Sequence, residues 1–72
     1  MQAHQERVIS ELEELTERRK KLDIFVGSSP VFLNLPLDEQ RRMKRQLEIM
    51  VDYEDVLQER IDHFPAEEQV PS

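Results

Sequence analysis

The side chains able to do chemistry in this chain of 72 residues are almost all charged. Nucleophilic catalysis needs a hydroxyl or thiol beside a base, yet the chain has no cysteine, and Ser10, Ser28 and Ser29 have no histidine nearby in a helical chain. The two histidines, His4 and His63, lie near opposite ends and offer no spacing for a structural zinc ion. A single glycine excludes a glycine-rich phosphate loop. We therefore expect a binding protein and not an enzyme, with neither a metal nor a cofactor.

The charge of the chain is unevenly distributed. Residues 17–48 carry eight basic and five acidic side chains, a net +3, whereas the rest of the chain carries two basic and eleven acidic ones, a net −9. The total of −6 and a pI of about 4.8 argue against a duplex-DNA partner. Two basic clusters, Arg18–Lys21 and Arg41–Arg45, can still form a local site for phosphate groups. Alternatively, these side chains form salt bridges with neighbouring acids and keep the protein in solution.

Two long helices must position these charges. Residues 2–26 have almost no helix breakers, and their apolar residues recur at three- and four-residue steps once Arg19 is counted in the series. Gly27 follows the last periodic residue and is predicted to end this helix in a left-handed conformation. The apolar positions are Val8, Leu12, Leu15, Leu22 and Val26.

The connection, residues 27–36, is predicted to contain one short helical turn. Ser29 suits the capping position and Pro30 the first helical position, where its missing N–H costs nothing. The segment is too apolar for a solvated loop, so we expect it to fold back and close the end of the hairpin. Its apolar residues are Val31, Phe32, Leu33 and Leu35.

The second helix is predicted over residues 37–63, opened by Pro36 and by acids in its first turn. Phe64 and Pro65 end it, because the residue before a proline disfavours the helical region. Residues 1–64 are thus expected to form one hairpin domain. Residues 65–72 have no periodicity and are predicted to form a disordered acidic tail.

The second helix carries two adjacent stripes of regularly spaced residues, and their combined width determines the predicted fold class. One stripe, interrupted by Glu54, matches the apolar face of the first helix, and the other lies beside it, with Ile9 as a possible neighbour. A face this wide needs more than one partner helix. The first stripe consists of Met43, Leu47, Met50, Leu57 and Ile61, and the second of Arg42, Gln46, Ile49, Tyr53, Val56 and Arg60.

We therefore predict an all-α fold: an antiparallel two-helix hairpin with a short helical turn in the connection, assembled into a homo-oligomeric helical bundle. A chain of this size without disulfides or metal relies on self-association to bury enough apolar surface. The sequence has no apolar run long enough to span a bilayer and no signal-peptide pattern. We expect the protein in the cytoplasm, without a membrane partner.

One ordered set of residues extends over most of the predicted hairpin, about residues 4–61. The set consists of His4-Gln5-Glu6-Arg7-Val8, Leu22, Phe25, Phe32, Leu35, Glu39-Gln40, Gln46-Leu47-Glu48-Ile49-Met50, Tyr53, Leu57 and Arg60-Ile61. This order resembles the helical-hairpin domain shared by phage anti-CBASS and anti-Thoeris sponge proteins. The resemblance implies a phage protein that acts in the cytoplasm of the bacterial host. It also implies an oligomer, commonly a hexamer, that holds cyclic di- or trinucleotides, or cyclic ADP-ribose derivatives, between its subunits without cleaving them.

A ligand site is predicted from this resemblance together with the chemistry of the side chains. Arginines bind phosphate oxygens, a tyrosine stacks on a base or donates a hydrogen bond, and a glutamine reads a base or ribose edge. The first choices are Arg7, Arg42, Arg45, Gln46, Tyr53 and Arg60, followed by Arg18, Lys21 and His4.

Two other functions are compatible with the sequence. The wide apolar face could dock on a host protein, which would make the chain a small helical inhibitor or scaffold without a nucleotide ligand. The basic clusters could bind RNA, although the overall acidity opposes this. Binding of a cyclic nucleotide by the protein alone would favour sequestration of a nucleotide messenger over docking on a host protein and over RNA binding.

Overall fold

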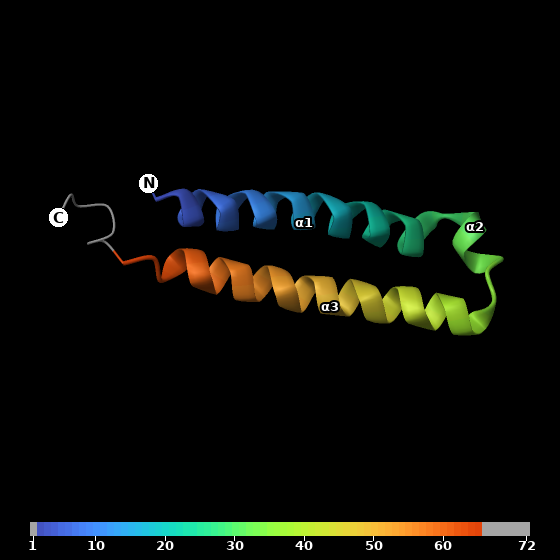
Figure 1. Cartoon of the computed structure of the whole chain (residues 1–72). Helices are drawn as coiled ribbons and strands as arrows, with labels where there is room; N and C mark the ends of the chain where they lie inside the picture. Colours follow the sequence, from blue (N-terminus) through green and yellow to red (C-terminus); the bar gives the residue numbers. More distant parts are fainter. Residues whose placement is uncertain (1, 66–72) are drawn as a thin grey trace.

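The computed structural model describes residues 2–65 and shows a helical hairpin (Figure 1). Helix α1 spans Ala3–Ser28, the short helix α2 spans Pro30–Leu33, and α3 spans Leu37–Asp62. The two long helices run antiparallel along a rod of 57 × 14 × 13 Å, with α2 at the closed end (Figure 1). The described part contains no strand, so the predicted helical hairpin is confirmed. Neither long helix in this part has an apolar stretch sufficient to span a bilayer.

The end of α1 differs from the prediction. The helix continues through Gly27 to Ser28, and Gly27 has no positive φ, so the expected left-handed ending is wrong. Ser29 ends the helix instead, with φ −84° and ψ 127°, because the residue before Pro30 is pushed out of the helical region. The hydroxyl of Ser28 donates to the carbonyl oxygen of Ile24 at 2.7 Å and supports the last turn.

The predicted turn in the connection is present as α2. The Ser29 side chain accepts a hydrogen bond from the backbone N–H of Val31 at 3.2 Å, and Pro30 occupies the first turn. The second long helix then begins after Pro36 and ends at Asp62, one residue earlier than predicted. Of the predicted tail, residues 66–72 lie outside the described residues.

Only part of the connection closes the end of the hairpin. Phe32 is 2% exposed and its ring meets Phe25 edge-on, with 6.0 Å between the ring centroids. Leu35 is half-buried. Val31 and Leu33, by contrast, are exposed, so the segment closes the end of the hairpin through Phe32 and Leu35 and not through all of its apolar residues. A helix of a single turn presents only one side to its neighbours, and Phe32 occupies that side.

The core between α1 and α3 follows the predicted first stripe. Leu57 is fully buried, and Val8 and Leu15 pack with it. Gln5, which the apolar pattern did not include, is also fully buried, and its side-chain oxygen accepts a hydrogen bond from the backbone N–H of Gln2 at 3.1 Å. The partly buried residues around this core are Leu12, Met50, Ile61 and Phe64. The interior of a single chain is therefore small.

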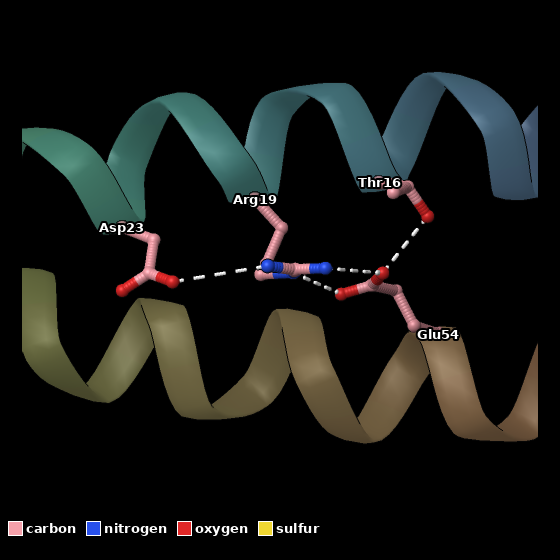
Figure 2. Close-up of polar contacts among 4 residues, drawn as sticks. All are labelled: Thr16, Arg19, Asp23 and Glu54. Atoms are coloured by element: carbon pink, nitrogen blue, oxygen red, sulfur yellow. Dashed lines mark hydrogen bonds and ion pairs between the residues drawn. The ribbon is translucent and has the colours of Figure 1, made fainter.

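A polar cluster joins the two helices near the middle of the rod (Figure 2). The guanidinium of Arg19 donates to Glu54 with 2.7 Å between Nε and Oε1, and the hydroxyl of Thr16 donates to the same carboxylate at 2.8 Å. The carboxylate oxygen Oδ2 of Asp23 lies 3.8 Å from Nη1 of Arg19 (Figure 2). Arg19 and Glu54 are the two polar positions that interrupt the apolar stripes of α1 and α3. They pair with each other, which fixes the register of the hairpin.

The hydrogen bond from Arg19 lowers the pKa of Glu54, although partial burial of the carboxylate opposes this shift. A carboxylate with a lowered pKa in the folded state stabilises the fold above its unfolded pKa, and this stability is lost as the pH falls through the folded pKa. We expect the urea midpoint of the protein to fall between about pH 6 and about pH 3, and to fall less in Glu54→Gln. Glu13→Gln, a change of an exposed glutamate on α1, should retain the wild-type pH dependence. Equal pH dependence in the two variants would contradict this role of Glu54.

Candidate functional site

The second stripe of α3 is exposed in the single chain. Ile49, Tyr53 and Val56 are 54%, 43% and 49% exposed, while α1 covers the side of α3 that carries Leu57. The stripe follows alternating four- and three-residue steps, so its members share one face of the helix. We call this row the α3 stripe; it consists of Arg42, Gln46, Ile49, Tyr53, Val56 and Arg60. Its predicted exposure in a lone hairpin is confirmed.

Tyr53 connects the α3 stripe with one face of α1. Its hydroxyl donates a hydrogen bond to the carboxylate of Glu11. Glu11 belongs to a row of heptad-spaced residues, which we call the α1 polar face. The α1 polar face consists of His4, Arg7, Glu11, Glu14, Arg18 and Lys21. Because Glu11 and Tyr53 meet, the α1 polar face and the α3 stripe lie on the same side of the hairpin.

This side of the hairpin carries the nine predicted ligand-binding residues. Four belong to the α1 polar face and four to the α3 stripe, while Arg45 borders the stripe one residue before Gln46.

Ile9 lies on a different face of α1 from the α1 polar face. It precedes Thr16 by seven residues and so shares its face of α1, and Thr16 contacts Glu54 from the first stripe. The prediction that Ile9 neighbours the exposed apolar patch is therefore wrong.

The nine residues are spread along the length of the rod. Arg42 and Arg60 lie on the same face of α3, but eighteen residues separate them, or about 27 Å at ~1.5 Å per residue. The start of α1, which carries His4 and Arg7, and the end of α3, which carries Arg60, lie at the open end of the hairpin (Figure 1). Arg18, Lys21, Arg42, Arg45 and Gln46 lie in the half nearer α2. One chain thus does not gather the predicted residues into a single pocket.

The arginines differ in how they are held. Arg42 donates to Glu39 at 2.8 Å and to Asp38 at 3.3 Å, and these contacts raise the pKa of its guanidinium. Arg18 lies 4.0 Å from Glu14. Within residues 2–65 no ion pair holds the other predicted cations, which are Arg7, Lys21, Arg45 and Arg60. These side chains are exposed and able to reach an anion.

A hollow on the surface of α1 lies among acids and does not suit a phosphate ligand. Glu13, Glu14 and Glu17 line it with only Lys20 as a cation, and none of the nine predicted residues takes part. The part of the chain that the structure describes holds no group of histidine and carboxylate side chains suited to a metal ion. The hollow therefore shares no residue with the predicted ligand site.

Comparison with known proteins gives one result. A family model described as Sequestin matches residues 2–63, which include α1, α2 and α3. No curated protein and no solved structure matches the chain.

Proposed function

The chain belongs to the Sequestin family, and from this premise we propose that it binds cyclic di- or trinucleotide messengers of bacterial immune signalling and holds them without cleaving them. The family name describes sequestration, which is a binding function and not catalysis. The exposed arginines agree with binding, because a guanidinium donates hydrogen bonds to phosphate oxygens. In this proposal the protein is encoded by a phage and acts in the cytoplasm of the infected bacterium.

The observation that carries the proposal is the exposed side of the hairpin on which α1 and α3 both present arginines. Arg7, Arg45 and Arg60 have no ion pair within residues 2–65, and a guanidinium offers two parallel donors to the oxygens of a phosphodiester. A cyclic oligonucleotide carries one such phosphate per nucleotide. Several arginines around one ligand would therefore each find a negatively charged partner.

We further propose that the ligand lies between subunits of a homo-oligomer, with a hexamer as the expected size. The described core contains only four buried apolar side chains, and three large side chains of the α3 stripe remain exposed. Self-association would cover this apolar row and bring arginines of several chains together by symmetry. A binding site assembled in this way would also withdraw the messenger from solvent.

Isothermal titration calorimetry with 3′,3′-cyclic GMP–AMP and with cyclic tri-AMP tests this function. We expect heat from at least one of them, with a Kd at or below about 1 μM, equivalent to roughly 8 kcal/mol of binding free energy. The bound nucleotide should be recovered chemically intact after the protein is denatured by heat, as chromatography would show.

Two controls separate binding of a cyclic messenger from nonspecific attraction. The linear dinucleotide pApG carries similar charge and should bind at least about 10-fold more weakly, because ordering a flexible ligand costs entropy. Absence of heat with every cyclic nucleotide tried would rule out the proposal in favour of a helical module that docks on a protein. Recovery of a hydrolysed nucleotide would contradict sequestration.

A further inference from the structure

The α3 stripe has the same spacing when read in either direction along the helix. Its steps are four, three, four, three and four residues, so it is symmetric about Val51. Arg42 mirrors Arg60 across this centre, and Ile49 mirrors Tyr53. Alternating steps of this kind are the spacing of a coiled-coil seam. When two copies of such a helix lie antiparallel, each residue meets its mirror position on the other copy.

We propose that the α3 stripe pairs antiparallel with the α3 stripe of a second copy, with the two-fold axis between Ile49 and Tyr53, at the level of Val51 along the helix. This pairing places Arg42 of each chain next to Arg60 of the partner subunit, and it does so once at each end of the interface. The geometry of pairing rests on the structure alone, whereas the ligand assigned to the arginine pairs rests on the function proposed above.

The exposed apolar side chains of the α3 stripe favour a second copy of this chain as the partner that covers them. Ile49 would pack on Tyr53 of the partner subunit, and Tyr53 on Ile49 of the partner subunit, so the centre of the seam is apolar. Val56 would meet Gln46 of the partner subunit, whose methylene groups cover it. The side chains now exposed in the middle of the α3 stripe are thus covered by the same row of the second chain.

Charge favours the antiparallel orientation of the two copies. Arg45 and Glu59 flank the α3 stripe on the same side, fourteen residues apart. Antiparallel pairing sets Arg45 of one chain near Glu59 of the partner subunit, and the reverse contact forms by symmetry. Opposite charges therefore meet twice along the border of the seam, whereas Asp52, midway between Arg45 and Glu59, meets Asp52 of the partner subunit once.

The α1 polar face, which lies on the same side of the hairpin, points to the same orientation. Its middle carries two acids, Glu11 and Glu14, followed toward α2 by two bases, Arg18 and Lys21. An antiparallel second copy sets the acidic half opposite the basic half. A parallel copy in the same register would set like charges against each other, which is unfavourable.

The ends of this seam have the properties of anion sites. Arg42 donates to Asp38 and Glu39 within its own chain, and a phosphodiester that takes the place of these carboxylates would hold Arg42 together with Arg60 of the partner subunit. The start of α1, which carries Arg7, and the end of α3, which carries Arg60, lie at the same end of the hairpin, so this end carries a further guanidinium. Neither chain completes such a site alone, because its own Arg42 and Arg60 are about 27 Å apart at ~1.5 Å per residue. The pairing also assigns Tyr53 to the interface and not to a nucleotide base.

Disulfide formation tests the pairing independently of any ligand. The natural chain has no cysteine, so Gln46→Cys and Val56→Cys each introduce a single thiol. When the two variants are mixed, refolded together and oxidised, we expect mainly the mixed 46–56 disulfide in nonreducing mass spectrometry. Mainly 46–46 and 56–56 disulfides would overturn the proposal by showing parallel pairing. A protein that stays monomeric in analytical ultracentrifugation at about 50 μM, where a specific dimer with a micromolar Kd would form, would overturn it as well.

Subunit complementation tests the arginine pairs. In Arg42→Gln or Arg60→Gln alone, every site keeps one arginine, and we expect affinity for 3′,3′-cyclic GMP–AMP or cyclic tri-AMP to fall about 10-fold or more. In a refolded equal mixture, each mixed pair has one site with both arginines, so about one site in four should recover wild-type affinity. Arg41→Gln, a change of an exposed arginine outside the α3 stripe, should bind like the wild type.

The two tests separate the failure of this proposal from the failure of the proposed function. A mixture that binds no better than either variant, while the wild-type protein binds, would overturn the arginine pairs. If the two cysteine variants form the 46–56 disulfide but the wild-type protein takes up neither nucleotide, the function is overturned and the helix pairing stays in place.

Discussion

Replacement of Leu57 by alanine is expected to lower the stability of the protein strongly. Leu57 is fully buried between α1 and α3, and loss of a buried leucine side chain costs about 2–5 kcal/mol through lost burial and a residual cavity. A chain of 72 residues has a total stability of only about 4–11 kcal/mol at ~0.05–0.15 kcal/mol per residue. The urea midpoint of the variant, followed by helical circular dichroism at fixed protein concentration, should therefore fall strongly.

Leu37→Ala is the matched control for this prediction. It makes the same chemical change in the same helix, but Leu37 is 68% exposed, so little buried contact is lost. We expect its urea midpoint to lie close to that of the wild type. Equal destabilisation by the two changes would mean that the core between the helices is not where the structure places it.

Replacement of Val56 by aspartate is expected to abolish self-association and, with it, ligand binding. Val56 lies in the α3 stripe, half exposed in one chain, and each two-fold interface would contain this change twice. Burying an unpaired carboxylate costs several kcal/mol, which exceeds what the few apolar contacts of this seam supply. In analytical ultracentrifugation the variant should sediment as a monomer, and calorimetry should show affinity for the cyclic nucleotide reduced about 100-fold or more.

Val51→Asp is the control, because it makes the same change in the same helix. Val51 is 42% exposed, similar to Val56, but it lies on the opposite side of α3 from the α3 stripe. We expect this variant to keep the oligomeric state and the affinity of the wild type. An assembly that tolerates Val56→Asp but not Val51→Asp would show that a different face of the hairpin forms the interface.

Assembly and sequestration are linked in this proposal, with a consequence for how the protein would act. A site that needs arginines from two chains exists only above the concentration at which the chains associate. Bound nucleotide would in turn stabilise the assembly by mass action, because it binds the paired state and not the lone chain. Uptake of the messenger should therefore rise more steeply with protein concentration than a simple one-to-one binding curve allows.

Much of the hairpin could be predicted because its signals are local. Steps of three and four residues identify both long helices, and Ser29-Pro30 identifies the restart between them, since each depends on residues within one or two helical turns. Gly27 was misread for the same reason. A glycine permits a left-handed ending but does not require one, and the restriction imposed by Pro30 decides where α1 ends.

The candidate site was predicted as residue types but not as an arrangement. The sequence alone identified the exposed α3 stripe and its arginines, because periodicity shows which residues of one helix share a face. It could not place α1 beside them, since the rotation of one helix about its axis depends on contacts between residues far apart in the chain. In the structure, the hydrogen bond between Tyr53 and Glu11 shows which face of α1 lies beside the α3 stripe.

The sequence by itself thus determined the two helices, the turn between them and the wide face that one partner helix cannot cover, since all of these follow from short-range periodicity and capping. Only the tertiary structure decided that Arg19 pairs with Glu54, that Phe32 alone of its apolar turn is buried, and that both arginine-bearing faces lie on one side of the rod. The physical reason is that packing and long-range hydrogen bonds depend on the relative position of two helices, which a one-dimensional pattern does not contain.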